Sequence, residues 1–210
     1  MRTFSVRVLW GFSREGSIQG FGLRGSLPEQ LAGLSSLTYL DLESNSISGS
    51  VPEQLASLSA LTGLYLDKNS ISGSVPEQLA SLSALTQLNL GTNRISGSVP
   101  EQLASLSLLM QFEIHNNAIS GTLAPNMLLT MTNLRSLAIQ ANSLSGSLPE
   151  PFPANLEVLL TQRNRFTGMA PSFEKLLRLK YLAIFGNNLR GHLSLPMNKE
   201  MNSVLAFSNR

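Results

Sequence analysis

Three glycines near the start of the chain match a nucleotide-binding pattern. Gly20, Gly22 and Gly25 spell G-x-G-x-x-G, which in dinucleotide-binding proteins follows a hydrophobic strand and opens a helix. Here Gly25 and the Leu-Pro pair that follows it coincide with the glycine, valine and proline of a repeated unit described below. We therefore expect no nucleotide site and no cofactor.

Two further patterns contain groups that could catalyse a reaction. Ser172 and Lys175 form S-x-x-K, in which a lysine can activate a serine nucleophile, but the companion motifs of such enzymes are absent from the sequence. Glu113 and His115 stand two residues apart, so in a strand they share a face on which an acid and an imidazole could exchange a proton. No nucleophile lies near them in sequence.

The chain contains no cysteine, which excludes disulfides, thiolate zinc sites and thiol nucleophiles. No other cluster of metal ligands is apparent. We predict that the protein is not an enzyme, with no catalytic residue and no bound metal.

The elements that would position any such side chain come from a repeat of about 24 residues. LTYLDLESNSISGSVPEQLASLSA (37–60) is followed by close copies at 61–84 and 85–108, and more divergent copies continue to residue 193. An asparagine recurs in every copy at intervals of 22 to 25 residues: Asn45, Asn69, Asn93, Asn117, Asn142, Asn164 and Asn187. This regularity predicts a solenoid of similar coils.

Each part of the unit predicts a local structure. In L-x-x-L-x-L, Leu40 and Leu42 point one way and their neighbours the other, which indicates a short strand that pairs in parallel with the next coil. The repeated asparagine can bond backbone groups of its own and adjacent coils. The S-G-x-V-P segment predicts a tight bend. Leu55 and Leu58, three residues apart, predict a 3₁₀ or helical turn on the outer wall.

The unit LxxLxLxxNxISGSVPEQLASLS resembles the plant-type leucine-rich repeat of receptor-like kinases, receptor-like proteins and polygalacturonase-inhibiting proteins. The resemblance implies an α/β fold: a right-handed horseshoe or superhelix with a parallel sheet on its concave face and short 3₁₀ or helical turns on the convex side. It also implies partner binding as the usual role. Members of that class begin with a cysteine-paired cap, whereas this chain keeps only Trp10 and Gly11 of it and has Phe21 at the first asparagine position.

We predict three parts of the chain. Residues 1–17 are an N-terminal segment or degenerate cap, 18–193 the repeat array, and 194–210 an incomplete final repeat. An array that stops inside a coil indicates a fragment, a truncated gene product, or a chain that pairs with another through its uncapped end. With no signal peptide, cysteine or glycosylation sequon, the sequence as written indicates a cytoplasmic protein; a receptor fragment would be extracellular or membrane-tethered. No apolar run is long enough to span a bilayer.

Charge is distributed unevenly along the array. Residues 25–120 contain eight acidic and two basic residues, and residues 121–210 contain four acidic and nine basic residues. The net charge of +2 gives no reason to expect nucleic acid as a partner. A protein or peptide that contacts this bipolar surface should bind in a salt-sensitive way.

The concave face is the predicted binding surface. Residues 46–62 and 70–86 are identical, whereas the outward strand positions between such copies differ. Selection for recognition would produce this pattern, and so would drift of unrestrained side chains; constant outer-wall residues such as Glu53 and Gln54 favour recognition. The candidate partner-binding residues are Tyr39, Asp41, Glu43, Tyr65, Asp67, Lys68, Asn89, Glu113, His115, Leu160, Arg163, Tyr181 and Phe185.

These residues predict an acidic zone with two tyrosines, followed by a more apolar zone with a basic residue. The function we expect is non-catalytic recognition or scaffolding of a protein or peptide. The alternatives are an inhibitor of a secreted hydrolase and a duplicated array with no specific partner.

Overall fold

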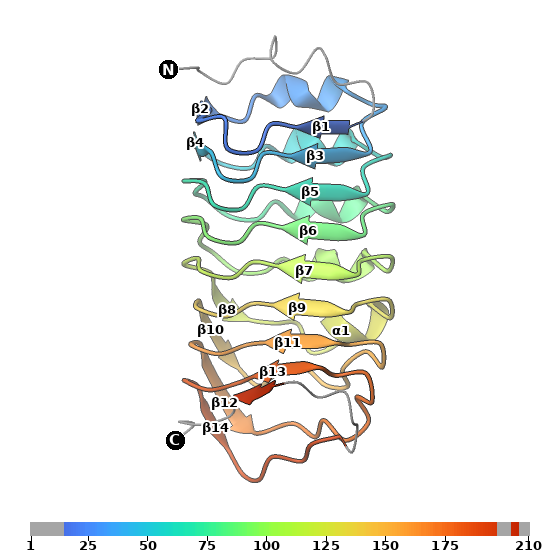
Figure 1. Ribbon diagram of the computed structural model, residues 1–210, viewed down its shortest axis with the longest axis vertical. Helices are drawn as coiled ribbons and strands as arrows, with labels where there is room; N and C mark the ends of the chain where they lie inside the picture. The colour runs from blue at the N-terminus through green and yellow to red at the C-terminus, as the bar shows by residue number, and fades with distance from the viewer. Residues whose placement is uncertain (1–14, 197–202, 206–210) are drawn as a thin grey trace.

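The repeated L-x-x-L-x-L segment forms one strand per coil. In the computed structural model, which describes residues 15–196 and 203–205, these strands make a nine-stranded parallel sheet. Figure 1 shows them stacked along the long axis of the molecule. They are β1 (Glu15–Ser17), β3 (Tyr39–Asp41), β5 (Gly63–Tyr65), β6 (Gln87–Asn89), β7 (Gln111–Glu113), β9 (Ser136–Ala138), β11 (Val158–Leu160), β13 (Tyr181–Ala183) and β15 (Ser203–Leu205). The predicted leucine-rich-repeat solenoid is confirmed.

The outer wall consists of short helical turns opposite the sheet (Figure 1). Leu55 and Leu58 are fully buried beneath such a turn, as their spacing predicts. The turns are η2 (Glu29–Gly33), η3 (Glu53–Ser57), η4 (Glu77–Ser81), η5 (Glu101–Ser105) and the α-helix α1 (Met127–Thr130). Strands pack about 4.8 Å apart and helical turns need more room, so solenoids of this construction generally curve toward their sheet. We call the outward face of the nine-stranded sheet the concave face.

One hydrophobic core runs the length of the array between the sheet and the outer wall. The strand register aligns Leu40 with Leu64 and Leu64 with Leu88, and all three are fully buried. Each coil therefore covers the apolar side chains of the coil before it, which is how three-residue strands become stable.

The repeated asparagine connects its own coil with the preceding coil. Asn69 Nδ2 donates to the carbonyl of Leu42 at 2.9 Å and to the carbonyls of Leu66 and Asp67 at 3.1 Å. Its Oδ1 accepts a hydrogen bond from the backbone N–H of Ile47 at 2.9 Å. The same pattern recurs at Asn45, Asn93 and Asn117, so the predicted bonds to the residue's own and neighbouring coils are confirmed.

A second set of parallel strands follows the asparagines, and the sequence did not predict it. β2 (Arg24–Ser26) pairs with β4 (Ser46–Ser48), and in the second half the strands pair in the order β14-β12-β10-β8. These four are β8 (Ser120–Thr122), β10 (Ser143–Gly146), β12 (Arg165–Met169) and β14 (Asn188–Arg190). The predicted bend is present as well, since Gly49 has φ 76 directly after β4.

The sheet reaches beyond the predicted limits of the array. β1 begins at Glu15, before residue 18, and β15 lies inside the segment 194–210. Phe21, at the first asparagine position, is 62% exposed. Trp10, Gly11 and the end of the chain lie outside the described residues. Among the described residues, no helix has the length and hydrophobicity to cross a membrane.

Candidate binding face

The concave face carries a different set of side chains on each coil. Strand alternation buries Leu64 and Leu66 and directs Tyr65 and Asp67 to the other side. The backbone register then places equivalent positions of successive coils next to one another across the sheet. All of the predicted binding residues lie on this face or in the turn directly after its strands.

Two tyrosines form an aromatic pair at the start of the face. The rings of Tyr39 and Tyr65 have centroids 5.1 Å apart and are tilted by 41°. Both lean over Gly63, where an added Cβ would lie 2.7 Å from Tyr39 Cδ2 and 3.1 Å from Tyr65 Cε2. The Tyr65 hydroxyl donates to the side chain of Gln87 on the next coil. Both rings therefore pack over Gly63, which is not among the predicted binding residues.

Next to the tyrosines lies a charged cluster of Glu43, Asp67 and Lys68. Lys68 Nζ is 2.5 Å from Glu43 Oε1 but 3.9 Å from Asp67 Oδ2. The hydrogen bond from Lys68 holds the pKa of Glu43 below its usual value. Burial, and secondarily the charge of Glu43, raises the pKa of Asp67 to about 6. The residue Asp67 is only 4% exposed, so it lies on the predicted face but is not the open surface residue that the sequence suggested.

Two other predicted residues have a structural contact as well. Asp41 Oδ1 accepts the backbone N–H of Glu43 at 3.0 Å, and Asn89 Oδ1 accepts that of Gly91 at 3.0 Å. Both bonds close the turn that ends the strand. Asp41 and Asn89 are half-buried, so a partner would meet them as parts of a fixed surface.

In the described part of the chain, most of the buried side-chain atoms that lack a hydrogen-bond partner lie in one row of the concave face. The row contains the residue two positions after each strand of the nine-stranded sheet. Four side chains in it hold a buried nitrogen or oxygen without a hydrogen-bond partner, and we call them the acceptor row: Asp67 (Oδ1), His115 (Nδ1), Gln140 (Oε1) and Gln162 (Oε1). Buried polar atoms are normally paired, so four exceptions at equivalent positions mark this row as unusual.

Glycine interrupts the acceptor row at position 91. A Cβ on Gly91 would overlap the imidazole of His115, which leans over it from the next coil. Sequence reasoning singled out His115 but neither Gly91 nor Gln140. The sequence shows only that Gly91 lacks a side chain at an outward position. This becomes informative once the His115 ring is seen to lie over Gly91.

Glu113 and His115 lie on the same face, but the buried Nδ1 of His115 has no hydrogen-bond partner, Glu113 included. Burial, followed by the charge of Lys68, lowers the pKa of His115, and burial raises the pKa of Glu113. A carboxylate paired with an imidazole would shift both pKa values in the opposite directions. The two groups are better described as half-buried polar parts of the face.

The second predicted zone lies on the last coils. Tyr181 is 44% exposed and pairs in register with Val158, while Leu160 and Phe185 are half-buried. Arg163 is exposed in the turn, where its backbone N–H bonds the carbonyl of Phe185 at 2.9 Å. These residues form the more apolar and basic surface that the sequence predicts, with Tyr181 as its most accessible aromatic group.

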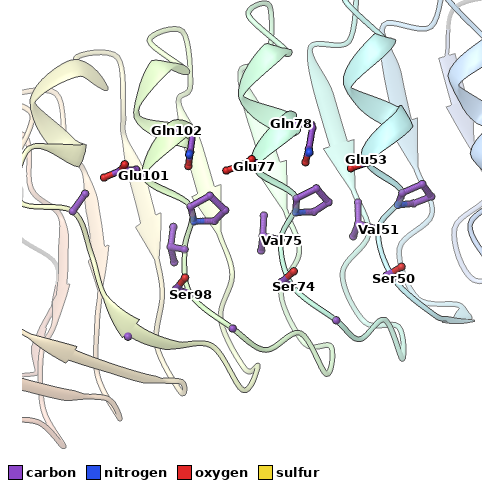
Figure 2. A pocket seen from close by; sticks show the side chains of 18 of the residues that line it. Ser50, Val51, Glu53, Ser74, Val75, Glu77, Gln78, Ser98, Glu101 and Gln102 are labelled. Atoms are coloured by element: carbon purple, nitrogen blue, oxygen red, sulfur yellow. The ribbon is translucent and has the colours of Figure 1, made fainter.

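A groove on the outer wall was not predicted from the sequence. The repeated Ser-Val-Pro-Glu-Gln segments of three successive coils line most of it, so the same side chains recur from one of these coils to the next (Figure 2). Glu29 and the Gly121–Pro125 segment line its two ends. The described lining residues include Glu29, Glu53, Glu77 and Glu101 but no lysine or arginine. The groove is therefore acidic and periodic, whereas the side chains of the concave face change from one coil to the next.

The nucleotide-binding pattern and the S-x-x-K pattern of the sequence fall in ordinary parts of the repeat. Of the glycines of G-x-G-x-x-G, Gly20 and Gly22 lie between β1 and β2 and Gly25 lies within β2, and the helical turn that follows them, η2, begins only at Glu29. Ser172 and Lys175 are exposed on the outer wall, with Phe173 buried between them. Within residues 15–196 and 203–205, no three histidine, aspartate or glutamate side chains gather into a metal-binding group.

Comparison with known proteins places the fold in a family. A leucine-rich-repeat model matches residues 23–71 and 35–95. The chain is 33% identical to a chain of the Arabidopsis thaliana BIR3–SERK2 complex, covering 65% of this chain and 70% of that one, with a TM-score of 0.56. The chain belongs to the leucine-rich-repeat family. The leucine-rich-repeat array also superimposes on the plant peptide hormone receptor RGFR1 in complex with RGF2, with a TM-score of 0.83 and 31% identity.

This chain spans less than a third of the length of RGFR1 and a smaller part of receptor-like protein 39. The superposition on RGFR1 includes 90% of this chain but only 31% of the RGFR1 chain. This chain is 37% identical to receptor-like protein 39 of Arabidopsis thaliana over 82 residues. The aligned segment is 35% of this chain and 9% of that protein. The resemblance to plant receptor repeats therefore concerns the repeat array itself.

Proposed function

We propose that the chain is a non-catalytic binding module whose concave face recognises a protein or peptide. The observation that supports this most strongly is the combination of a constant framework with a concave face that changes on every coil and holds unpaired acceptors. A surface without internal repetition offers a ligand one register, and buried unpaired acceptors can be satisfied by donors from a partner.

The similar solved structures are consistent with this role. RGFR1 is described in complex with the peptide RGF2, and the receptor kinase HAESA with the peptide hormone IDA and the co-receptor SERK1. Recognition of a peptide or protein by this leucine-rich-repeat chain would be the corresponding activity. The chain spans 30% of the HAESA chain, so any signalling role of the larger proteins is not carried over.

The test is a selection of random dodecapeptides displayed on phage against the immobilised full chain. Peptides that bind are then measured against a concave-face variant with Tyr65, Arg163, Tyr181 and Phe185 changed to alanine. Arg163 lies at φ 57, a position equivalent to that of Ala141 at φ 54, so alanine fits the turn. We expect at least a hundredfold weaker binding, since aromatic and arginine side chains dominate interface energies.

The matched control changes four side chains of the outer wall: Glu53, Gln54, Glu77 and Gln78 to alanine. All four are exposed, and binding should change less than threefold. Peptides that lose affinity to the outer-wall variant and keep it with the concave-face variant would refute the proposal.

A further inference from the structure

The carboxylate of Asp67 is buried and incompletely paired. Its side chain is 6% exposed, and its Oδ1 has no hydrogen-bond partner. Its Oδ2 is 3.9 Å from Lys68 Nζ, beyond the length of a good hydrogen bond. Burying a charged group in this way costs free energy unless a cation compensates it, so the folded chain retains an arrangement that weakens its own stability.

Lys68 cannot compensate both acids of the cluster. Its ammonium is a compact charge that bonds Glu43 at 2.5 Å and leaves Asp67 farther away. The lysine side chain is 58% exposed, so it has room to swing into solvent. An exposed ion pair of this kind contributes little to stability, so an incoming cation could displace it at little cost.

We propose that Glu43 and Asp67 form a subsite for an arginine side chain of a peptide ligand, which replaces Lys68. This inference rests on the proposed function, since it names the chemistry of the ligand on the same face. A guanidinium is planar and presents five N–H donors in a fork, so it can donate to two carboxylates at once. The oxygen of Asp67 that has no partner would then gain a charge-assisted hydrogen bond.

The surroundings of the subsite favour the same ligand. Residues 25–120 carry eight acids and two bases, which would steer a cationic peptide toward these coils. The aromatic pair of Tyr39 and Tyr65 lies beside the cluster and offers a ring face to a guanidinium. Farther along, His115 and Gln140 of the acceptor row could accept from the N–H groups of the same peptide.

The experiment measures binding of fluorescein-labelled nona-arginine to the full chain by fluorescence anisotropy at 150 mM salt, with nona-lysine as the comparison probe. Asp67→Asn is expected to weaken nona-arginine binding at least tenfold, because it removes one partner of a charge-assisted bond. Glu77→Gln, the control, removes the same charge from the outer wall of the same coil and should change the affinity less than twofold. Nona-lysine should bind several-fold more weakly than nona-arginine.

A second variant tests the displacement of Lys68. Asn116 occupies the equivalent turn position at φ 51, so Lys68→Asn suits the backbone at φ 52. It should tighten nona-arginine binding at least threefold more than Arg94→Asn, which removes an exposed positive charge from the next coil. Equal effects of Asp67→Asn and Glu77→Gln, equal affinity for the two probes, or no gain from Lys68→Asn would each overturn the subsite.

Failure of the subsite can be separated from failure of the proposed function. Selected dodecapeptides that depend on Tyr181 and Phe185 but not on Asp67 would preserve the binding role of the face and reject the arginine subsite. Peptides that depend on neither would reject both.

Discussion

The concave face and the outer-wall groove cover the same coils but differ in how they repeat. In the groove, Glu53, Glu77 and Glu101 occupy equivalent positions with equivalent neighbours, as Figure 2 shows. On the concave face the equivalent row reads Glu43, Asp67, glycine, histidine. A ligand in the groove could shift by one coil and meet the same contacts, whereas a ligand on the concave face has a single register.

Both surfaces rest on one hydrophobic core, so a mutation in the core should destabilise both of them alike. Leu88→Ala deletes a fully buried side chain, for which we expect a loss of about 2–5 kcal/mol in the free energy of unfolding. Denaturant unfolding gives this value, and hydrogen exchange should show faster exchange on β6 and η4 alike.

The control is a leucine outside the core. Leu108 is 47% exposed, and Leu108→Ala should change the free energy of unfolding by less than about 0.5 kcal/mol. If the two variants unfolded at the same denaturant concentration, the described packing of the solenoid would be wrong.

The asparagine ladder tests how the concave face is joined to the rest of each coil. Asn93 donates to the carbonyls of Leu66, Leu90 and Gly91 and accepts from the N–H of Ile71. Asn93→Ala would leave these groups unpaired, and we expect a loss of about 2–3 kcal/mol, measured by denaturant unfolding. Asn126→Ala is the control, because the Asn126 side chain is exposed and caps no helix N–H. An equal loss in both variants would contradict the ladder's role.

The sequence predicts the framework far better than the working surface. Leu40, Leu55 and Asn69 have fixed roles because the repeat copies their environment in every coil, so periodicity alone reveals strand, turn and ladder. The second set of strands was missed because β4 and its partners gain their hydrogen bonds from neighbouring coils, which local propensity does not register.

The concave face was located correctly as a set of outward positions, but not its internal contacts. The burial of Asp67 depends on where the neighbouring Lys68 and Glu43 side chains lie. The placement of His115 depends on the absence of a side chain at Gly91 on another coil. Both are contacts between coils at positions where the repeat is not copied, so no pattern in the sequence specifies them.

The unpaired acid of the concave face should cost stability, unlike the repeated acids of the groove. The pKa of Asp67 is raised from 3.8 to about 6, so the folded state loses stability as the pH rises from 3.8 to about 6 and stays at the lower level above that. Asp67→Asn should therefore stabilise the chain by about 1–2 kcal/mol at pH 7.5. As the pH falls through 6, wild-type Asp67 is protonated and the advantage shrinks, to less than about 0.5 kcal/mol at pH 4.

Thermal unfolding of wild type and Asp67→Asn at the two pH values checks this sign. Glu77→Gln in the groove should stay within about 0.5 kcal/mol of wild type at both, since Glu77 is exposed. A variant that is more stable yet binds nona-arginine more weakly would show that Asp67 is retained for binding. Destabilisation at pH 7.5 would instead mean that the carboxylate is compensated in the folded chain.

The smallest expected effect comes from replacing a glycine by alanine, once on the concave face and once on the outer wall. On the concave face, Gly91→Ala would push the His115 imidazole from its seat, at a cost of about 1 kcal/mol, because the ring is the movable end of a side chain. On the outer wall, a Cβ at Gly33 would meet nothing within 4 Å, and Gly33→Ala should be neutral or stabilise by about 0.4–1 kcal/mol. Thermal unfolding measures the change in stability. In NMR spectra, the His115 ring resonances should shift in Gly91→Ala and stay in place in Gly33→Ala.

Since Gly91 interrupts the acceptor row, unchanged His115 resonances in Gly91→Ala would mean that the row is not packed as described. The single register of the concave face would then lose its structural basis.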